Sequence, residues 1–326
     1  MIDKRFVDSV GIEIPVICGA MYPCSNPELI AAVSEAGGIG IVQPISLSYV
    51  WGHDYRKGLQ LIQTLTKKPW GMNAILEKSS RVYEERMRGW IETALEEGCR
   101  LIVTALGKPD WVVKQAHAAG ALVYHDVTEL KWAKKAIDAG VDGLICVNGR
   151  AGGHAGSRTP QQLFDELREI QVPKICAGGV GSEAEFKAAL EMGYAGVQMG
   201  TRFIATEECK SHEDYKRAIV DAKESDIVLT ERVTGIPLAV IQTPYVEKVG
   251  TKAGPVARWL LKHRRSKEWM RLWYNIRALW SMKRSAKRGL STKDYWQAGK
   301  SVDTIFRIEP VAEIMKRFRS VYGEIR

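Results

Sequence analysis

The 326-residue sequence lacks the features that mark membrane, secreted and zinc-binding proteins. It has no run of about 18 uncharged apolar residues, and the N-terminal segment carries charges at Asp3, Lys4 and Asp8 without an apolar core. The six cysteines are scattered, with no CxxC pair and no Cys/His cluster at zinc spacing. We therefore expect a globular protein of the reducing cytoplasm, without a disulfide framework and without a metal site.

Both common glycine-rich nucleotide fingerprints are also missing. Because the sequence has neither a GxGxxG motif nor a Walker motif, a phosphate site in this protein need not belong to a dinucleotide or a nucleoside triphosphate. Hydrophobic residues nevertheless make up 45% of the chain, which is enough to form the core of one large α/β domain or two smaller ones.

Acidic residues are nearly absent from one segment of the chain. Between Lys248 and Arg288, thirteen Lys and Arg residues accompany a single acid, Glu268, so the local net charge is +12 while the whole chain carries +9. The rest of the chain is therefore slightly acidic, and the basic character belongs to this segment.

A junction recurs in which a helix-like run ends in glycine and a short apolar run follows. Glycine just beyond a helix adopts the left-handed C′ conformation, and four to six continuously apolar residues suit a strand that is buried on both faces. The pattern is typical of parallel βα units. The junctions are "SEAGGIGIV" (34–42), "EEGCRLIV" (96–103), "AAGALVYH" (118–125), "DAGVDGLICV" (138–147) and "EMGYAGVQM" (191–199).

Three further apolar runs, at 14–18, 69–75 and 172–179, complete a set of eight strands that alternate with helices. Eight such units predict an α/β fold of the (β/α)8 TIM-barrel type, although an open doubly wound sheet uses the same units. The barrel domain is predicted to cover 1–210 and 291–326, with its last helices returning to complete it. Segment 211–290 is predicted to be a helical, basic, tryptophan-rich addition.

Glycines follow two of the predicted strands at the end where TIM barrels carry their active sites. The stretch 178–181 contains three glycines and comes directly before a helix capped by Ser182, an arrangement that points backbone N–H groups at an anion. Gly200 and Thr201 would add an N–H and a hydroxyl from the adjacent strand. Tight turns alone would also explain these glycines, but two neighbouring loops of this kind favour a phosphate site.

A histidine lies in a loop of small residues after the predicted sixth strand. In "RAGGHAG", residues 150–156, the close approach of a ligand would explain the glycines around His154. Imidazole titrates near neutral pH, so His154 is the candidate catalytic residue; a surface histidine without a role is the alternative. His125 and Asp126, at the end of the fifth strand, are predicted to face the same rim and to contact the substrate.

A series of stretches resembles the motifs of one known family. In order, they are "PVICGAMYP", "LIAAVSEAGGIGIV", "PWGMNAIL", "AGVDGLICVNGRAGGHAG", "VPKICAGGV", "MGTRFIAT" and "YWQAGKS". They resemble the nitronate monooxygenase family, formerly called 2-nitropropane dioxygenases, whose superfamily includes FMN-dependent enoyl-acyl-carrier-protein reductases and NADH:quinone reductases. The resemblance covers roughly 10–210 and 294–315, and it does not extend to 215–290.

The resemblance implies a TIM barrel that binds FMN non-covalently, with His154 as the active-site histidine that contacts the nitronate or acts as its base. In such chemistry the flavin takes electrons from the substrate and then reacts with O2, while the protein supplies position and electrostatics. The cofactor-binding residues that it implies are Gly19, Ala20, Met21 and Asn73 at the flavin, Gly152 and Gly153 where the backbone passes close to it, Ala177, Gly178, Gly179, Gly200 and Thr201 at the phosphate, and Gln297 and Gly299 near the pocket.

Two positions depart from the family pattern. Arg150 stands where many relatives have an acid, and His125 with Asp126 stand where relatives often have a Lys or small polar residues. A cation at position 150 would favour an anionic substrate, either a nitronate or a phosphopantetheine-linked acyl group, although it could equally be solvated.

The basic segment also contains four of the ten tryptophans, with apolar residues at helical spacing. Such a helix could pack on the barrel with a solvated basic face, cover the flavin as a lid, or contact a membrane surface through 255–290. Nucleic acid is not expected as a partner, because aromatics on one helical stripe are typical of a buried face. A homodimer is a further alternative that the sequence leaves open.

Three functions follow from these observations. The first is an FMN-dependent monooxygenase that oxidises alkyl nitronates with O2. The second is an NAD(P)H-dependent flavin reductase of quinones or enoyl thioesters, which the missing Rossmann fingerprint slightly disfavours. The third is an accessory protein that retains FMN without turnover and associates with a membrane or a carrier protein.

Overall fold

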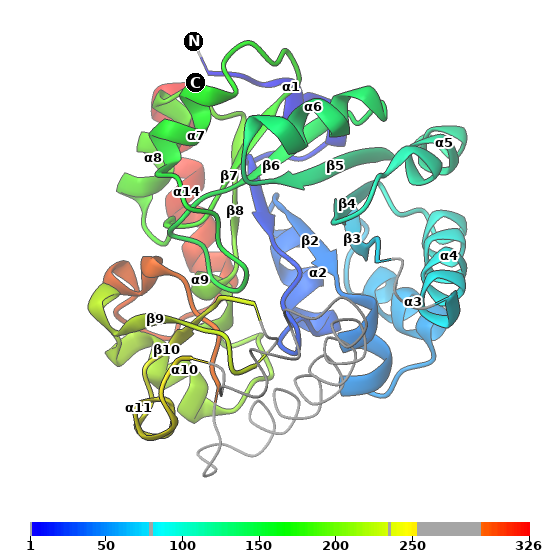
Figure 1. Ribbon diagram of the computed structural model, residues 1–326. Helices are drawn as coiled ribbons and strands as arrows, with labels where there is room; N and C mark the ends of the chain where they lie inside the picture. The colour runs from blue at the N-terminus through cyan, green and yellow to red at the C-terminus, as the bar shows by residue number, and fades with distance from the viewer. Residues whose placement is uncertain (1, 78–80, 234–235, 253–294) are drawn as a thin grey trace, which may run out of the picture.

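The computed structural model describes residues 2–77, 81–233, 236–252 and 295–326. Eight parallel strands close into a barrel in sequence order, because β1 pairs with β2 on one side and with β8 on the other (Figure 1). This closure confirms the predicted TIM barrel and excludes the open sheet. The strands are β1 (Val16–Cys18), β2 (Ile39–Val42), β3 (Trp70–Ile75), β4 (Leu101–Ala105), β5 (Leu122–Val127), β6 (Gly143–Val147), β7 (Lys174–Ala177) and β8 (Gly196–Met199).

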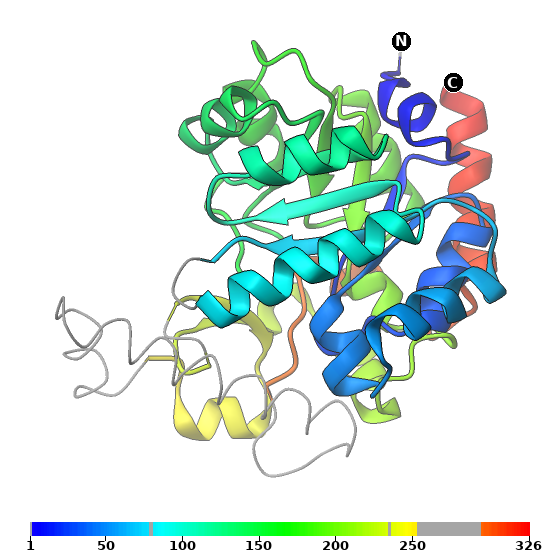
Figure 2. The same ribbon diagram turned by 90° about the vertical axis from the view of Figure 1, so that its right-hand side faces the viewer.

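Helices surround the strands as an outer ring (Figures 1 and 2). Thr159 and Ser182 begin two of them with complete capping boxes, in which the hydroxyl accepts from an N–H of the first turn. A short π-helix, η1 (Ser46–Val50), follows β2. The helices of the ring are α2 (Pro27–Glu35), α3 (Tyr55–Leu65), α4 (Arg81–Glu96), α5 (Asp110–Ala118), α6 (Leu130–Asp138), α7 (Pro160–Glu166) and α8 (Glu183–Glu191).

The eighth place in the ring is taken by a helix from the end of the chain. α14 (Val311–Ile325) packs against both α8 and α2. Its Phe318 ring lies 5.1 Å from the Phe186 ring of α8, measured between centroids. The last helix of the chain therefore lies in the outer ring, between α8 and α2.

A helix before the first strand identifies the inner face of the barrel. α1 (Arg5–Val10) carries Phe6, whose ring lies 5.5 Å from the Tyr124 ring of β5. A Cβ added to Gly196 of β8 would lie 3.1 Å from the same Phe6 ring. Because β5 and β8 are not neighbours, Phe6 lies inside the barrel, and Tyr124 and Gly196 point inward.

Strand alternation then places three polar side chains inside the barrel, toward the C-terminal ends of its strands. Asp126 follows the inward Tyr124 by two residues, and Gln198 follows the inward Gly196 by two. Asn73 of β3 shares the inward face through the register of β3, β4 and β5.

Between β8 and α14, the chain forms an addition at the end of the barrel opposite the two termini (Figures 1 and 2). Its antiparallel strands β9 and β10 are an element that the helical periodicity did not predict, since four residues are too few for a period-2 pattern to stand out. The described elements are α9 (Thr201–Ile204), α10 (Glu213–Asp221), η2 (Glu224–Asp226), β9 (Ile227–Thr230), β10 (Leu238–Ile241), α11 (Pro244–Val249) and η3 (Lys300–Thr304).

The basic, tryptophan-rich segment falls within 253–294, which lies outside the described residues. The predicted lid or membrane contact through 255–290 therefore stays a prediction. In the described ranges, no helix combines the length and the hydropathy that crossing a bilayer requires.

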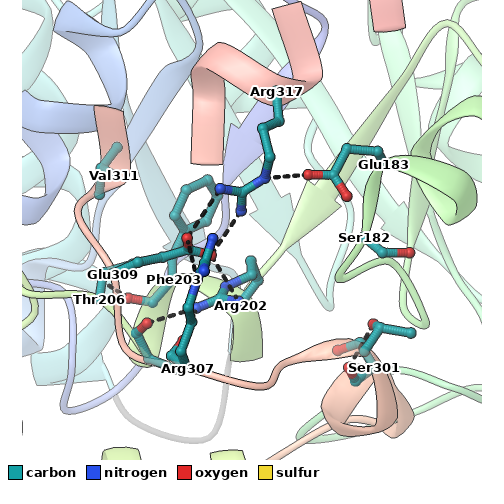
Figure 3. A network of polar contacts seen from close by, with 12 residues as sticks. Ser182, Glu183, Arg202, Phe203, Thr206, Ser301, Arg307, Glu309, Val311 and Arg317 are labelled. Carbon is teal, nitrogen blue, oxygen red and sulfur yellow. Dashed lines mark hydrogen bonds and ion pairs between the residues drawn. The ribbon is translucent and has the colours of Figure 1, made fainter. Parts of the chain in front are cut away.

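A buried network of ion pairs holds residues 295–326, here called the returning chain, against the barrel (Figure 3). Glu309 accepts two hydrogen bonds from Arg317, at 2.9 and 2.7 Å, and lies 3.4 Å from Nη1 of Arg202. Arg202 is only 3% exposed and also donates to the carbonyl oxygens of Ala205 and Arg307, at 2.7 and 2.8 Å. Burial lowers the pKa of Arg202 to about 10, so its guanidinium is still charged at neutral pH and is paired with Glu309.

The substitution Glu309→Gln should lower the free energy of unfolding by about 3 kcal/mol, because it leaves the Arg202 charge buried without a carboxylate. Arg307→Ala is the control: that side chain is 71% exposed, so losing its ion pair with Glu309 should cost less than about 1 kcal/mol. Urea unfolding measures both, and equal losses would contradict a special role for the buried pair.

Candidate functional site

Loops from β1 and β8 lie side by side at the C-terminal end of the barrel. Gly19 directly follows β1, and a Cβ there would lie 3.0 Å from Cγ of Gln198. A Cβ on Gly200 would lie 3.3 Å from Sδ of Met21. The structure thus brings together the predicted flavin residues of the first loop and the predicted phosphate residues of the last.

The returning chain reaches the same place through a contact between glycines. A Cβ on Gly152 would lie 2.9 Å from the backbone nitrogen of Gly299, and the Gly299 N–H donates to Oγ1 of Thr201 at 2.9 Å. Gly153 has a φ of 72° and faces Oε1 of Gln297, 3.2 Å from where a Cβ would stand. Gly152 therefore permits a close approach to protein backbone, and the predicted approach to the flavin stays a prediction.

The glycines after β7 pack on the loop after β6. Gly178 and Gly179 both have positive φ values, of 115° and 79°. A Cβ on Gly178 would lie 2.5 Å from the nitrogen of Ala151, and one on Gly179 would lie 2.6 Å from Nε of Arg150. Nη1 of Arg150 also lies 2.9 Å from Oε2 of Glu224. Arg150 is therefore placed over the predicted phosphate loop, in an ion pair.

The helix N-terminus that was predicted to face an anion already holds a carboxylate. Oε2 of Glu185 accepts hydrogen bonds from the N–H groups of Gly181 and Ser182, at 2.8 and 3.1 Å. It also accepts from the hydroxyls of Ser182 and Thr304, at 3.2 and 3.0 Å. A phosphate near β7 would therefore use the loop before Gly181, since a second negative charge at the helix end would be repelled.

His154 lies on the exposed side of this group of loops. Its Nδ1 is 3.1 Å from the carbonyl oxygen of Pro237, which can only accept, so Nδ1 carries the hydrogen and Nε2 of the neutral ring carries the lone pair. Loss of hydration next to the surrounding protein lowers the pKa of His154 below 6.5, and the hydrogen bond to Pro237 opposes this effect in part. Such a ring can accept a proton at neutral pH.

The strand β10 forms backbone hydrogen bonds both with the loop that contains His154 and with the returning chain. The Ala239 N–H donates to the carbonyl of Gly153, and the Ile241 N–H donates to the carbonyl of Trp296, each at 2.8 Å. Pro237, which accepts from His154, directly precedes this strand. This support was not predicted from the sequence, where its signal is the short apolar run "LAVI" after a proline.

His125 and Asp126 point to opposite faces of β5, because successive residues of a strand alternate. The His125 ring is 5% exposed, and its Nδ1 lies 2.8 Å from Oγ1 of Thr104. Burial lowers its pKa to about 4, so it is neutral at pH 7. The expectation that both side chains face the same rim does not hold: Asp126 points into the barrel and His125 points away from it.

Two of the inward polar side chains have an oxygen atom that accepts no hydrogen bond from the described residues. Within the described ranges, Oδ1 of Asp126 and Oε1 of Gln198 are inaccessible to solvent and have no hydrogen-bond partner. Nδ2 of Asn73 donates to the carbonyl of Val103 at 3.2 Å. Burial raises the pKa of Asp126 to about 7. Because buried polar atoms in proteins are normally paired, this inner face is suited to a polar ligand.

The family model for nitronate monooxygenase matches residues 3–319. A (3aS,4S,5R,7aS)-5-hydroxy-7a-methyl-1-oxo-octahydro-1H-indene-4-carboxyl-CoA dehydrogenase of Rhodococcus jostii (strain RHA1) is 31% identical over 252 residues, which cover 76% of this chain and 69% of that protein. A probable nitronate monooxygenase of Staphylococcus saprophyticus is 26% identical over 291 residues, covering 76% of this chain and 81% of that protein. Among solved structures, FabK from Thermotoga maritima superimposes with a TM-score of 0.80 at 28% identity, covering 100% of this chain and 99% of the other.

The substitution Gly152→Ala tests the contact between the two glycine backbones. The added methyl group would stand 2.9 Å from the Gly299 nitrogen, so we expect the free energy of unfolding to fall by about 1–3 kcal/mol. Gly323→Ala is the control, because no atom lies within 4 Å of its added Cβ and alanine favours the helix there. Thermal unfolding measures both, and unchanged stability of the first variant would contradict the contact.

The substitution Asp126→Asn should stabilise the ligand-free protein at alkaline pH. Folding raises the pKa of Asp126 from 3.8 to about 7, so the folded chain loses stability as the pH rises between those values. The variant should exceed the wild type by about 4 kcal/mol at pH 8 and by little at pH 4. Asp110→Asn, at an exposed position, is the control in urea unfolding at both pH values. A pH-independent difference would argue against a buried carboxyl.

Proposed function

The chain belongs to the nitronate monooxygenase family, whose members are oxidoreductases, and from this premise we propose that it is an FMN-dependent enzyme that oxidises alkyl nitronates with O2. The observation that carries the proposal is His154, exposed beside the mouth of the barrel with its Nδ1–H donated to Pro237. The family gives the class of reaction, and this histidine gives a base for it.

The residues around the mouth fit FMN. Gln198 and Asp126 each present an oxygen that needs a partner, which the polar edge of an isoalloxazine ring supplies. Gly19 and Met21 border the same space from the β1 loop, with Asn73 inside the barrel. The ring would be held by these five residues together with Ala20.

The phosphate of FMN would be held by the loops after β7 and β8, through Ala177, Gly178, Gly179, Gly200 and Thr201. Arg150 lies over Gly179, and its guanidinium would offset the phosphate charge at that end of the cofactor. We therefore assign Arg150 to the cofactor and no longer to the substrate. Four further residues would act indirectly, by packing the returning chain against these loops: Gly152, Gly153, Gln297 and Gly299.

FMN, when bound, supplies the capacity to accept electrons from the substrate and to pass them to O2. The protein contributes the base. Nε2 of His154 accepts a proton from a carbon acid next to a nitro group, or as imidazolium stabilises the negative charge of the nitronate that is already formed. The hydrogen bond from Nδ1 to Pro237 fixes the ring orientation and the tautomer.

An acyl thioester is the second candidate substrate. The observation that favours it is the 31% identity to a protein named as a dehydrogenase of a carboxyl-CoA compound. The same histidine could take a proton from the carbon next to a thioester carbonyl. The NAD(P)H-dependent flavin reductase that the sequence also allowed is a further candidate.

Anaerobic reduction of the bound flavin distinguishes these functions. The purified protein is first checked for FMN by its absorbance spectrum and is then mixed separately with an alkyl nitronate, NADH, NADPH and a saturated acyl-CoA. We expect rapid bleaching by the nitronate. Bleaching by NADH or NADPH alone, or by the acyl-CoA alone, would contradict the nitronate proposal and select one of the alternatives, and a protein that binds no FMN would exclude all three.

With a neutral nitroalkane as substrate, the substitution His154→Ala should retain FMN and reduce kcat/KM by about 100-fold or more, because it removes the group that accepts the substrate proton. His117→Ala is the control, since that exposed histidine lies in the last turn of α5. In the wild type, kcat/KM for the neutral nitroalkane should fall as the pH drops through the pKa of His154, which lies below 6.5, because the protonated ring cannot accept a proton. Loss of FMN from the variant would instead indicate a structural role.

A further inference from the structure

Asp126 is a buried acid that the proposed reaction does not use. It is the penultimate residue of β5 and points into the barrel, two residues beyond the inward Tyr124. The residue as a whole keeps some exposed surface, whereas its Oδ1 atom is inaccessible. Asp126 is therefore an inward acid with one oxygen atom fully withdrawn from solvent.

The neighbours of Asp126 on the inner face cannot hydrogen-bond to it through their side chains. Ile145 of β6 is in direct register with Asp126, and Ala105 of β4 stands one residue beyond Thr104, the register partner of His125. Both Ile145 and Ala105 are apolar. Oδ1 consequently has no partner within the described ranges.

The charged and titratable groups around Asp126 do not offset the free-energy cost of burying its carboxyl group. His125 on the same strand points to the opposite face and bonds to Thr104. Cys146 on β6 is a fully buried thiol whose pKa Asp126 helps to raise, and it carries no charge at neutral pH. Burial is the cause assigned to the shifted pKa of Asp126 itself. No cation faces Asp126 from the described parts of β4, β5 and β6.

An uncompensated carboxyl is costly in a folded chain, and such groups gather at functional sites. Gln198, on the inner face of β8, also has an unpartnered oxygen, so two inward side chains of the barrel lack a hydrogen-bond partner. A polar ligand bound at this end of the barrel would supply what these oxygens lack.

We propose that Asp126 faces the bound isoalloxazine as a neutral carboxylic acid and holds one of the protons taken up when the flavin is reduced. This rests on the proposed binding of FMN in the mouth of the barrel. The electrons come from the substrate, or in a test from an added reductant, and the proton comes from solvent. Asp126 is a positioning and proton-holding residue, and His154 remains the base that acts on the substrate.

The charge of the reduced flavin determines in which direction the protonation of Asp126 changes. Reduction adds negative charge to the flavin, and a nearby negative charge favours the protonated form of a carboxyl group. With oxidised flavin, Asp126 loses its proton as the pH rises above neutral. With reduced flavin it keeps the proton to a higher pH, so in that range each two-electron reduction places one additional proton on Asp126.

The test is the pH dependence of the reduction potential of the bound flavin. The holoenzyme is reduced anaerobically with xanthine and xanthine oxidase in the presence of a reference dye, at a series of pH values from 6 to 9. In the wild type we expect the number of protons taken up per two electrons to increase by one above about pH 7. Asp126→Asn should lose this increase, Asp126→Glu should restore it, and the exposed control Asp110→Asn should behave as the wild type.

The outcomes separate this inference from the proposed function. A wild type that binds no FMN would overturn the proposed function, and the inference with it. A wild type that binds FMN and shows no increase, or an Asp126→Asn variant that keeps it, would overturn the inference alone. If Asp126→Asn fails to bind FMN, infrared difference spectra of the wild-type holoenzyme decide: above neutral pH, reduction should produce a protonated-carboxyl band, and its absence would overturn the proposal.

Discussion

The contact between the backbones of Gly152 and Gly299 is the constraint on which the rest of the site depends. It brings the end of the chain onto the loop after β6, and the Gly299 N–H then reaches the hydroxyl of Thr201 at the end of β8. Because a side chain at either glycine would separate the two segments, the arrangement requires glycine at both positions. The loops after β6 and β8 and the returning chain are thereby held as one unit.

Two buried acids illustrate how this barrel distributes its charges. Glu309 fastens the returning chain and is surrounded by Arg202, Arg307 and Arg317, so that its negative charge is fully matched. Asp126 lies inside the barrel with one oxygen unpaired. The first arrangement is typical of a structural anchor, since every charge has a partner within the chain. The second is typical of a site that a ligand completes.

The structure changes the role that we assign to Arg150. As a residue next to the histidine loop, it was a candidate for attracting an anionic substrate. In the folded chain its side chain lies over Gly179 and pairs with Glu224, so its charge is placed at the loop that we propose for the FMN phosphate. The proposed substrate site is then left with the surroundings of His154, next to Pro237 and β10.

The sequence by itself determined the barrel and the identity of most loop residues at its mouth. Five glycine-ended helices followed by short apolar runs, together with three further apolar runs, specify parallel βα units through local backbone preferences, so all eight strands were predicted without a structure. Only the tertiary structure decided which way the side chains face and what they touch. His125 and Asp126 are adjacent in sequence but lie on opposite faces of β5, and Glu185 occupies the helix end predicted for an anion. Pro237, directly before β10, accepts a hydrogen bond from His154 across 83 residues of chain. These features depend on contacts between distant segments, which local sequence patterns do not encode.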